Sequence, residues 1–393
     1  MKYQEYELDE LLPYEQPQAY IVESTQYSDS YSTPVLTAGK SFILGYTNET
    51  EGVFEELPVI IFDDFTTATQ FVNFKFKVKS SAMKILHINT NLVLPKYIYY
   101  LLKTIHIDHS THKRYWISQF SRIKVSIPSI PEQQCIVSRI EELFSSLDNA
   151  VETLQKTKEQ LKVYREAVLK EAFEGKLTQK WRSIHHKNYE WKYVSITEII
   201  KSDKNALKAG PFGSALKKEV YVSSGYKIYG QEQVIAGDEK IGDYFVGEDK
   251  YQELISCKVA PNDILISLVG TVGKVLVLSD NCKAGIINPR LIKVSLDDNK
   301  MLPYYFKYYF ESGYLKSLYK GKAHGATMDV LNMGMIKELP FSWCPIDEQK
   351  QVIVEIESRM SSCDNIEKTV NATLDQVEAL RLSILKEAFE GRL

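Results

Sequence analysis

The chain has 393 residues, of which 44% are hydrophobic and 25% are charged, and its formal net charge is −3 at pH 7. Such a composition is typical of a globular protein, and the length suffices for two or three domains. Five dispersed cysteines without CxxC spacing argue against a zinc site and against a disulfide framework. No apolar run approaches the roughly 18 residues of a membrane span, and the polar start does not look like a signal peptide, so we expect a cytoplasmic protein.

Residues 1–130 form the first predicted globule. Short β-type runs, PVIIFDDF and FVNFKFKVK, are followed by a tyrosine-rich helix that starts at Leu94-Pro95. Charge is divided unevenly, because residues 1–64 carry 2 basic and 13 acidic side chains, whereas residues 65–130 carry 10 basic and 1 acidic. The basic stretch fits an anion-binding face or simple pairing with the acidic stretch, and charge alone leaves both open.

Two basic segments of this globule supply candidate contacts to DNA phosphates or bases. They are Lys75 and Lys77 in FKFKVK, and His112, Lys113 and Arg114 in HSTHKRYW. For the second segment an ordinary loop is an equally good interpretation. The acidic pair in FDDF is better explained as a strand end than as a nuclease metal site, since no general base accompanies it.

Residues 131–178 predict a long helix. It begins at Pro131, contains neither proline nor glycine in its interior, and reaches Gly175, which suits a C-cap. Apolar positions alternate in steps of three and four, which is a heptad pattern. The predicted seam includes Ile136, Ile140, Leu143, Leu147, Leu154 and Leu161.

Residues 179–343 form the second predicted globule, again with β-type runs and a helix that starts at Leu302-Pro303. The loop KAGPFGSALKK combines glycines, lysines and a phenylalanine that we expect to be exposed. LVGTVGKV fits a hairpin turn better than a nucleotide-binding loop, and INPRL lacks the residues of a methyltransferase motif. The DNA-binding candidates are Lys208, Phe212, Ser214, Lys217, Lys218, Thr271, Lys274, Arg290, Lys322 and His324.

Residues 344–393 repeat the first helix. Shifting the chain by 216 positions aligns Glu132–Leu177 with Glu348–Leu393 without a gap, and 20 of 46 positions are identical. LKEAFEGKL returns as LKEAFEGRL. The second seam includes Val352, Ile356, Ile366, Val370, Val377, Leu380 and Ile384. Because two amphipathic helices of this length need partners for their apolar stripes, we expect them to pair with each other.

The predicted fold is therefore α+β, with two mixed globules separated by two long helices that form an antiparallel coiled coil, and with a pseudo-two-fold internal repeat. This alternation resembles the specificity (S) subunit of type I restriction-modification enzymes over essentially the whole chain. The helix starts with Glu132-Gln133 and Glu348-Gln349, the two LKEAFEG[KR]L ends, LISLVGTVGKV and GATMDVLNMGMIKELPF carry the resemblance. The first globule departs from it, because IIFDDFTTATQFVNFKF stands where a GTVGK block is expected.

The resemblance implies that each globule is a target recognition domain for one half of a bipartite, asymmetric site in double-stranded DNA. It implies that the coil sets the spacing and docks two methyltransferase subunits, with restriction (translocase) subunits as further partners. It implies no catalytic residue, metal or cofactor in this chain, with S-adenosylmethionine, ATP and Mg²⁺ used by partner subunits.

Two other classes remain open at this stage. One is the specificity subunit of a methylation-only system, and the other is a coiled-coil structural or interaction protein that does not bind DNA. A self-contained nuclease or methyltransferase is disfavoured, because no metal or cofactor motif is evident.

Overall fold

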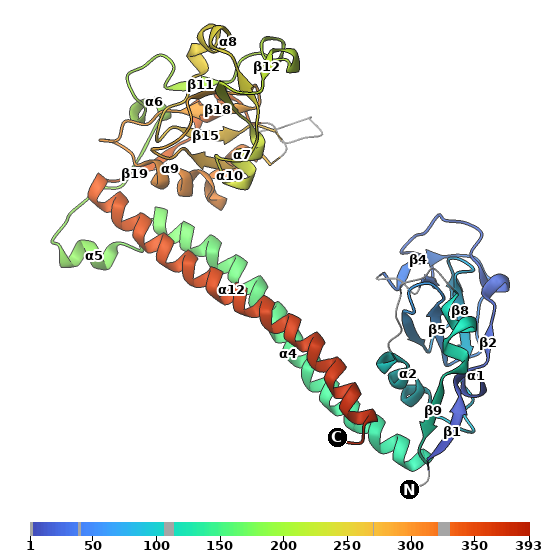
Figure 1. Cartoon of the computed structure of the whole chain (residues 1–393). Helices are drawn as coiled ribbons and strands as arrows, with labels where there is room; N and C mark the ends of the chain where they lie inside the picture. Colours follow the sequence, from blue (N-terminus) through green and yellow to red (C-terminus); the bar gives the residue numbers. More distant parts are fainter. Residues whose placement is uncertain (1–2, 38–40, 106–113, 270, 321–330) are drawn as a thin grey trace. The chain divides into compact units, whose positions relative to one another are not determined.

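The computed structural model describes residues 3–37, 41–105, 114–269, 271–320 and 331–393. The chain divides into two compact units. Unit 1 comprises Met1–Gln155 and Val370–Leu393, and unit 2 comprises Lys156–Thr369. Each unit contains one globule and parts of both long helices (Figure 1). Within the described ranges, no helix has the length and the apolar character that crossing a membrane requires.

The first globule contains nine strands and three short α-helices in the described ranges. The strands are β1 (Gln4–Glu7), β2 (Tyr14–Glu15), β3 (Thr33–Leu36), β4 (Ile43–Thr47), β5 (Val59–Asp63), β6 (Thr69–Val72), β7 (Lys77–Val78), β8 (Met83–His87) and β9 (Lys124–Ile127). The helices are α1 (Leu8–Leu11), α2 (Pro95–Thr104) and α3 (Tyr115–Ser118).

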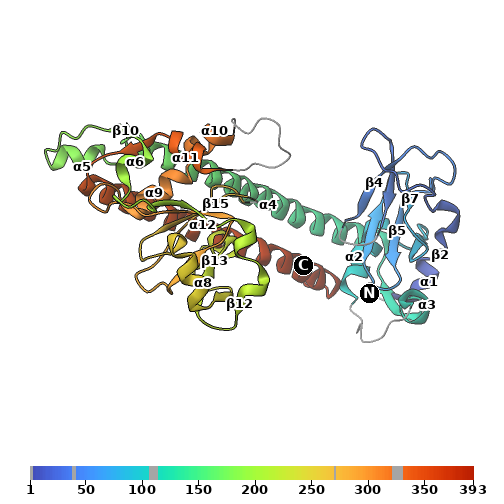
Figure 2. The ribbon, with the colours of Figure 1, turned by 90° about the horizontal axis from the view of Figure 1, so that it is seen from above.

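Two sheets and a two-stranded ribbon make up this globule (Figure 2). The antiparallel sheet has the order β2-β8-β5-β6, and a second sheet, β4-β3-β7, contains the parallel pair β3 and β7. Strand β5 is buried on both faces, since Ile60 and Phe62 enter one apolar cluster and Val59 and Ile61 enter another. This two-sided burial explains the uninterrupted apolar run VIIF.

The second globule contains ten strands and six short α-helices in the described ranges. The strands are β10 (Lys192–Val194), β11 (Leu207–Ala209), β12 (Tyr221–Val222), β13 (Tyr226–Tyr229), β14 (Phe245–Val246), β15 (Ile264–Ser267), β16 (Val275–Val277), β17 (Gly285–Ile287), β18 (Leu291–Val294) and β19 (Phe341–Trp343). The helices are α6 (Ile196–Ile199), α7 (Gln231–Ala236), α8 (Glu248–Glu253), α9 (Pro303–Phe310), α10 (Gly313–Lys320) and α11 (Met333–Glu338), and α5 (Gln179–Ile184) precedes the globule.

The second globule repeats the strand topology of the first, except that its second sheet has one further strand, β12. Its antiparallel sheet has the order β11-β18-β15-β16, and the sheet β12-β14-β13-β17 contains the parallel pair β13 and β17. Strand β15 is sandwiched as β5 is, because Ile264 and Ile266 face one apolar cluster and Leu265 faces another. The two globules therefore share a fold, although their sequences have little in common outside the helix starts and ends.

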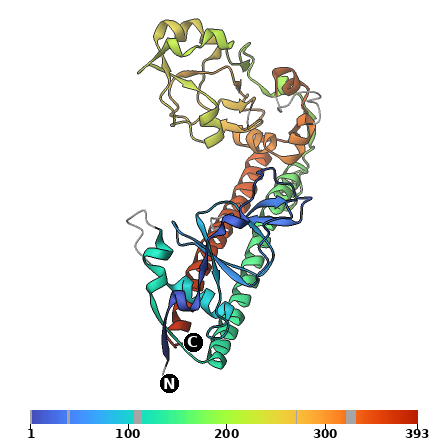
Figure 3. The same ribbon diagram turned by 90° about the vertical axis from the view of Figure 1, so that its right-hand side faces the viewer.

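The long helices α4 (Ile130–Phe173) and α12 (Ile346–Phe389) each have 44 residues and pair antiparallel (Figures 1 and 3). In unit 1, Ile140 of α4 packs against Leu385 and Ala388 of α12. The expected α+β architecture with two long paired helices is confirmed.

Two ion pairs between α4 and α12 are copies of one interaction. In unit 2, Nη2 of Arg165 lies 2.8 Å from Oδ1 of Asp364, and in unit 1 Arg381 forms an ion pair with Asp148. Each residue is shifted by 216 positions from its counterpart. The residue numbers in both pairs have the same sum, as one antiparallel register requires. These contacts explain why the aspartates and arginines are identical in both copies of the repeat.

The predicted seam was partly wrong. Ile366 and Leu380 are 46% and 47% exposed and lie outside the interface. The buried row at Cys363, Val370, Val377 and Ile384 is joined by positions four residues later, including Glu367 and Arg381, rather than three residues later. Apolarity alone could not distinguish a step of three residues from a step of four, because the step of four places a charged residue, Arg381, in the half-buried row. Its guanidinium pairs with Asp148.

The other predicted seam residues are buried or half-buried, and two of them, Val352 and Ile356, pack in the apolar cluster of the second globule. Ile140, Leu161, Val352, Ile356, Val370, Val377 and Ile384 are buried. Ile136, Leu143, Leu147 and Leu154 are half-buried.

One repeated glutamine ties each globule to its long helix. In unit 1 the Oε1 of Gln133 accepts the Leu94 N–H (2.7 Å), and its Nε2 donates to the carbonyls of Leu92 and Pro128. In unit 2 the Gln349 amide makes the same three bonds, to Leu302 N, Lys300 O and Cys344 O. Leu94 and Leu302 are the N-cap residues of α2 and α9, so the amide satisfies a backbone donor that the helix start leaves free.

We predict that Gln133→Ala lowers the free energy of unfolding by about 2–4 kcal/mol, because one buried and two partly buried backbone groups lose their partner. The matched control is Gln134→Ala, whose exposed side chain contacts Ser138 on its own helix and should matter by less than about 0.5 kcal/mol. Urea unfolding followed by circular dichroism measures both variants, and equal small shifts would refute the structural role of Gln133.

Candidate nucleic-acid interface

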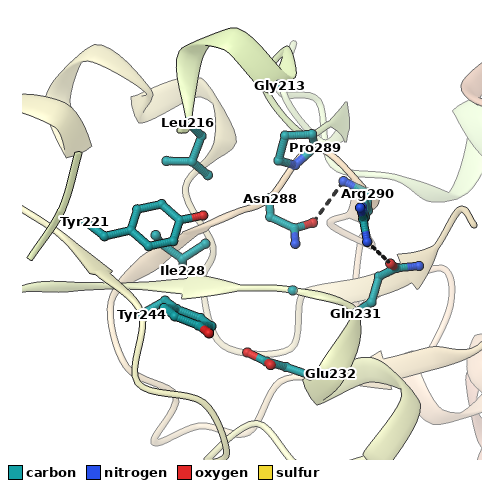
Figure 4. Close-up of a pocket in the computed structure, with 11 residues that line it drawn as sticks. Gly213, Leu216, Tyr221, Ile228, Gln231, Glu232, Tyr244, Asn288, Pro289 and Arg290 are labelled. Carbon is teal, nitrogen blue, oxygen red and sulfur yellow. Dashed lines mark hydrogen bonds between the residues drawn. The ribbon is translucent and has the colours of Figure 1, made fainter. Parts of the chain in front are cut away.

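A cavity of about 510 Å³ opens on the second globule, where two segments with predicted DNA contacts, Lys208–Lys218 and Ile287–Leu291, converge (Figure 4). Side chains from a loop, two strand ends and the start of a helix line it. The lining residues are Gly213, Leu216, Tyr221, Ile228, Gly230, Gln231, Glu232, Tyr244, Asn288, Pro289 and Arg290.

The loop KAGPFGSALKK forms one wall. Its backbone approaches Asn288 so closely that a β-carbon at Gly210 would lie 1.8 Å from the Asn288 carbonyl oxygen, so only glycine fits there. This contact positions the next turn, in which Phe212 is 89% exposed. Ser214, Lys217 and Lys218 are exposed on the same loop, whereas Lys208 lies half-buried in β11.

The segment Asn288-Pro289-Arg290 follows β17 and forms the opposite wall. The Asn288 N–H donates to Tyr229 O (2.8 Å), and the Asn288 side-chain oxygen accepts the Arg290 N–H (2.9 Å). This turn holds the exposed Arg290 at the rim, where its Nη1 lies 3.4 Å from the Oε1 of Gln231 (Figure 4). The guanidinium is thus oriented by a neutral partner, and among the described residues most of its five donors have no other partner and can bind a ligand.

Gln231 is the residue that sequence reasoning missed. It begins α7, and its Nε2 donates to Ser267 Oγ (3.0 Å) and to Val269 O, which anchors the amide to the turn between β15 and β16. Thr271 and Lys274 are exposed on that turn. A lone glutamine after a strand is no motif, so only the fold reveals that it connects Arg290 to the hairpin.

Two tyrosines and a carboxylate complete the cavity. The rings of Tyr221 and Tyr244 lie 5.4 Å apart between centroids, and Glu232 faces them (Figure 4). Burial, together with the nearby Tyr244 and Glu232, raises the pKa of Tyr221, so its phenol stays neutral at physiological pH. A guanidinium, an amide, two phenols and a carboxylate form a mixed set of donors and acceptors, which suits the polar edges of a base better than a uniform polyanion.

In the first globule the two strand lysines have different roles. Lys75 is exposed and pairs with Glu55 at 2.7 Å. Lys77 was wrongly predicted as an accessible contact, because its side chain is only 5% exposed and its Nζ binds Glu49 (2.8 Å) and the Glu51 carbonyl (2.6 Å). Burial opposes ionisation of Glu49, but hydrogen bonds from Lys77 and from backbone N–H groups outweigh it and lower the Glu49 pKa.

The FDDF turn is structural. Asp63 accepts the N–H groups of Phe65 and Thr66, both at 2.8 Å, and the buried Asp64 pairs with the buried Lys84 at 3.2 Å. Across the described ranges, no group of three or more His, Cys, Asp or Glu side chains could hold a metal ion.

The remaining candidates are divided between the described and the undescribed segments. Arg114 is exposed as the N-cap residue of α3. His112, Lys113, Lys322 and His324 lie outside the described residues.

Comparison with protein families gives one match that covers most of the chain. The family described as the type I restriction modification DNA specificity domain matches residues 1–163 and 188–376.

Two relatives from enteric bacteria are similar over parts of their length. The specificity subunit of the type I restriction enzyme EcoR124I/EcoR124II of Escherichia coli is 46% identical over 174 residues, which are 41% of this chain and 43% of that protein. The StySPI specificity subunit of Salmonella potsdam is 27% identical over 288 residues, 70% of this chain and 59% of that protein. The matched part thus spans about half the length of these relatives.

Two solved structures share the fold. A chain from a study of complex assembly and conformational transition in the type I R-M system aligns with a TM-score of 0.69 and 14% identity, over 100% of this chain and 98% of that one. The HsdS subunit from Thermoanaerobacter tengcongensis aligns with a TM-score of 0.53 and 14% identity, over 100% and 97%.

We predict that Lys77→Ala lowers the free energy of unfolding by about 2–4 kcal/mol at pH 7, because it leaves the partly buried Glu49 unpaired. The matched control, Lys75→Ala, should change it by less than about 0.5 kcal/mol. The folded-state pKa of Glu49 is lowered from 4.5, so the ion pair stabilises fully above that value and its contribution is lost as the pH falls below it. Urea unfolding of both variants at pH 7 and pH 3 measures this, and a Lys77→Ala effect that persists undiminished at pH 3 would contradict it.

Proposed function

The chain belongs to the family of type I restriction modification DNA specificity domains, and from this premise we propose that it is a specificity subunit whose two globules each read one half of a bipartite, asymmetric DNA site. Two globules with one topology and different surfaces support this proposal. A shared fold supplies the same mode of docking, and different exposed side chains supply different half-sites.

The cavity lined by Arg290 and Gln231, together with the exposed Phe212 on the neighbouring loop, is the observation that carries the proposal. Arginine is the commonest side chain that recognises guanine, through two hydrogen bonds, and Gln231 orients Arg290 while its own amide is held by Ser267 and Val269. Phe212 is 89% exposed, and an aromatic ring on a DNA-binding surface can stack on bases or wedge between them. The surrounding Lys217, Lys218 and Lys274 are exposed and suit the phosphate backbone.

For the first globule we propose a different contact set. Lys75 and Arg114 are its exposed described candidates, and the undescribed segment between Ile105 and Arg114 contains His112 and Lys113. The turn between β5 and β6 occupies the topological place of the turn between β15 and β16. We therefore assign the second half-site to this side of the first globule.

The paired helices are proposed to set the spacing between half-sites and to dock two methyltransferase subunits. Both α4 and α12 pass from one unit into the other, so their length constrains both globules covalently. Several apolar side chains on the helices remain exposed, which favours docking of other helices. They are Val163, Tyr164, Val354, Ile366, Leu380 and Leu382.

We propose that this chain is not itself a catalyst and works in the cytoplasm. Members of this family are generally DNA-recognition components, and adenine methylation with S-adenosylmethionine, or ATP- and Mg²⁺-dependent cleavage, would be carried out by methyltransferase and restriction subunits. A methylation-only complex is the second candidate, because a specificity subunit would use the same DNA-binding surface in a restriction-modification complex and in a methylation-only complex.

Methylation mapping tests the proposed function. We expect that the chain, co-expressed with its methyltransferase partner in a host free of DNA methylation, directs adenine modification to one split motif with a fixed gap. Long-read sequencing of the genome reads the motif directly. An assembled complex that leaves the genome unmodified would refute the specificity function and favour a structural coiled-coil protein.

We predict that Arg290→Ala weakens binding of the complex to this motif by about 10- to 100-fold, the cost of about 1–3 kcal/mol for a lost base contact. Binding to unrelated DNA should change far less, because a base contact acts only on its own sequence. Lys250→Ala is the matched control, a cation of the same globule already paired with Glu253. Fluorescence anisotropy at fixed salt measures each affinity, and an equal loss on both DNAs would reduce Arg290 to a phosphate contact.

A further inference from the structure

The turn that carries Arg290 is bounded by two backbone hydrogen bonds. At its start, the Asn288 N–H donates to the carbonyl of Tyr229, the last residue of β13 (2.8 Å). At its end, the Arg290 carbonyl accepts the N–H of Leu268, the residue that follows β15 (3.0 Å). These two bonds define a position in the fold that does not depend on side chains, so the same position can be located in the first globule.

The first globule has a turn at this position, between β7 and β8. The Lys79 N–H donates to the carbonyl of Leu36, the last residue of β3 (2.9 Å). The Ala82 carbonyl accepts the N–H of Asp64, the residue that follows β5 (3.1 Å). The two turns, KSSA and NPR, share no residue, so only the strand pairing reveals that they correspond. The exposed residues of the turn in the first globule are Lys79, Ser80 and Ser81.

A tyrosine lies beside this part of the second sheet in both globules. In the second globule, β12 flanks β14, and the ring of its Tyr221 lies 5.4 Å from that of Tyr244 (Figure 4). In the first globule, the Ser28 N–H donates to the Tyr46 carbonyl of β4 (3.1 Å). This bond places Tyr27 beside β4, as Tyr221 is placed beside β14. The two turns therefore have the same kind of aromatic neighbour.

A glycine brings the tyrosine of the first globule closer to its strand. Gly45 is the register partner of Val35, the second-last residue of β3. Tyr244 bonds to Ile228, the second-last residue of β13 (2.9 Å), so the two positions correspond. A β-carbon at Gly45 would lie 2.6 Å from that of Tyr27, which only glycine avoids. The second globule thus has a pair of tyrosines here, whereas the first has one tyrosine packed directly on the strand.

Lys79 lies over this tyrosine. Its Nζ is 5.9 Å from the centroid of the Tyr27 ring, and no carboxylate in the part of the chain that the structure describes pairs with it. The two lysines before it in FKFKVK both pair with glutamates. A ring face attracts an ammonium group without occupying its three N–H donors. Lys79 is therefore oriented by a neutral partner, as Arg290 is oriented by Gln231, and keeps donors for a ligand.

We propose that the turn Lys79–Ser81 contacts the bases of the half-site that the first globule recognises, and that Lys79 binds a guanine there. This assignment rests on the proposed function and adds to it a residue and a base. An ammonium group has donors and no acceptor, so it selects the two acceptors, O6 and N7, that guanine presents in the major groove. The hydroxyls of Ser80 and Ser81 both donate and accept, which suits the edges of neighbouring bases.

Binding of the assembled complex to duplex DNA tests the assignment, and fluorescence anisotropy at one salt concentration measures it. The duplexes carry the intact split motif, or the motif with one or the other half scrambled. We expect Lys79→Ala to weaken binding to the intact motif by about 10- to 100-fold, as for a lost base contact. The loss should vanish when one half is scrambled and persist when the other half is scrambled, and Arg290→Ala should show the opposite dependence.

Two further variants and one modified base separate base recognition from folding and from charge. Lys124→Ala removes an exposed cation of the same globule, on β9 of the two-stranded ribbon, and should leave binding to every duplex unchanged. Lys79→Arg keeps donors that guanine accepts, so it should restore most of the affinity for the intact motif. In the affected half, 7-deazaguanine in place of guanine removes the N7 acceptor. It should weaken binding of the unaltered protein at one position and leave that of Lys79→Ala unchanged.

Three results would overturn the assignment while the proposed function stands. An equal loss on all duplexes would make Lys79 a phosphate contact. A loss that depends on the same half as that of Arg290→Ala would place both residues on one half-site. Unchanged binding by Lys79→Ala would exclude a contact. A complex in which even the unaltered chain shows no preference for a split motif would instead refute the proposed function, and the assignment with it.

Discussion

The antiparallel register of α4 and α12 is the constraint on which the rest of the molecule depends. Two kinds of contact hold the helices together, and they differ in how much each contributes to stability. Each buried Val, Leu or Ile side chain stabilises the pairing by about 1.5–3 kcal/mol, whereas a surface ion pair contributes about 0–1 kcal/mol. Asp148 and Asp364 are 66% and 70% exposed, so the twin arginine–aspartate pairs add little stability. Their place is to select one alignment among those that the heptad stripes permit.

The two globules adopt similar folds with different sequences. Each has a central strand buried on both faces, a hairpin beside it and a parallel pair in the second sheet. The backbone pattern accounts for the shared architecture, and the side chains that leave the sheets differ freely. The cavity of the second globule arises in this way, from loops that follow common strands but carry their own residues.

The repeat, the two long helices and the presence of β-rich globules could be predicted, because they depend on local periodicity and on comparison of the chain with itself. The strand order could not, since β3 and β7 or β13 and β17 pair across long stretches of sequence. The seam was misjudged at Ile366 and Leu380 because a charged residue, Arg381, occupies the interface row. Lys77 was misjudged because its partners lie on another segment. Arg290 and Phe212 could be named as candidates from their loops, whereas the contact between Gln231 and Arg290 is visible only in the fold.

The hydrogen bonds that Gln133 and Gln349 make to their globules have a consequence for which substitutions the globules can accept. Gln133 and Gln349 grip their globules by main-chain N–H and C=O groups, which every residue at those positions offers, proline's missing N–H aside. The joint is therefore indifferent to the side chains of the part that it holds. Substitutions at the residues that Gln133 and Gln349 hold therefore leave these hydrogen bonds in place as long as the backbone keeps its course.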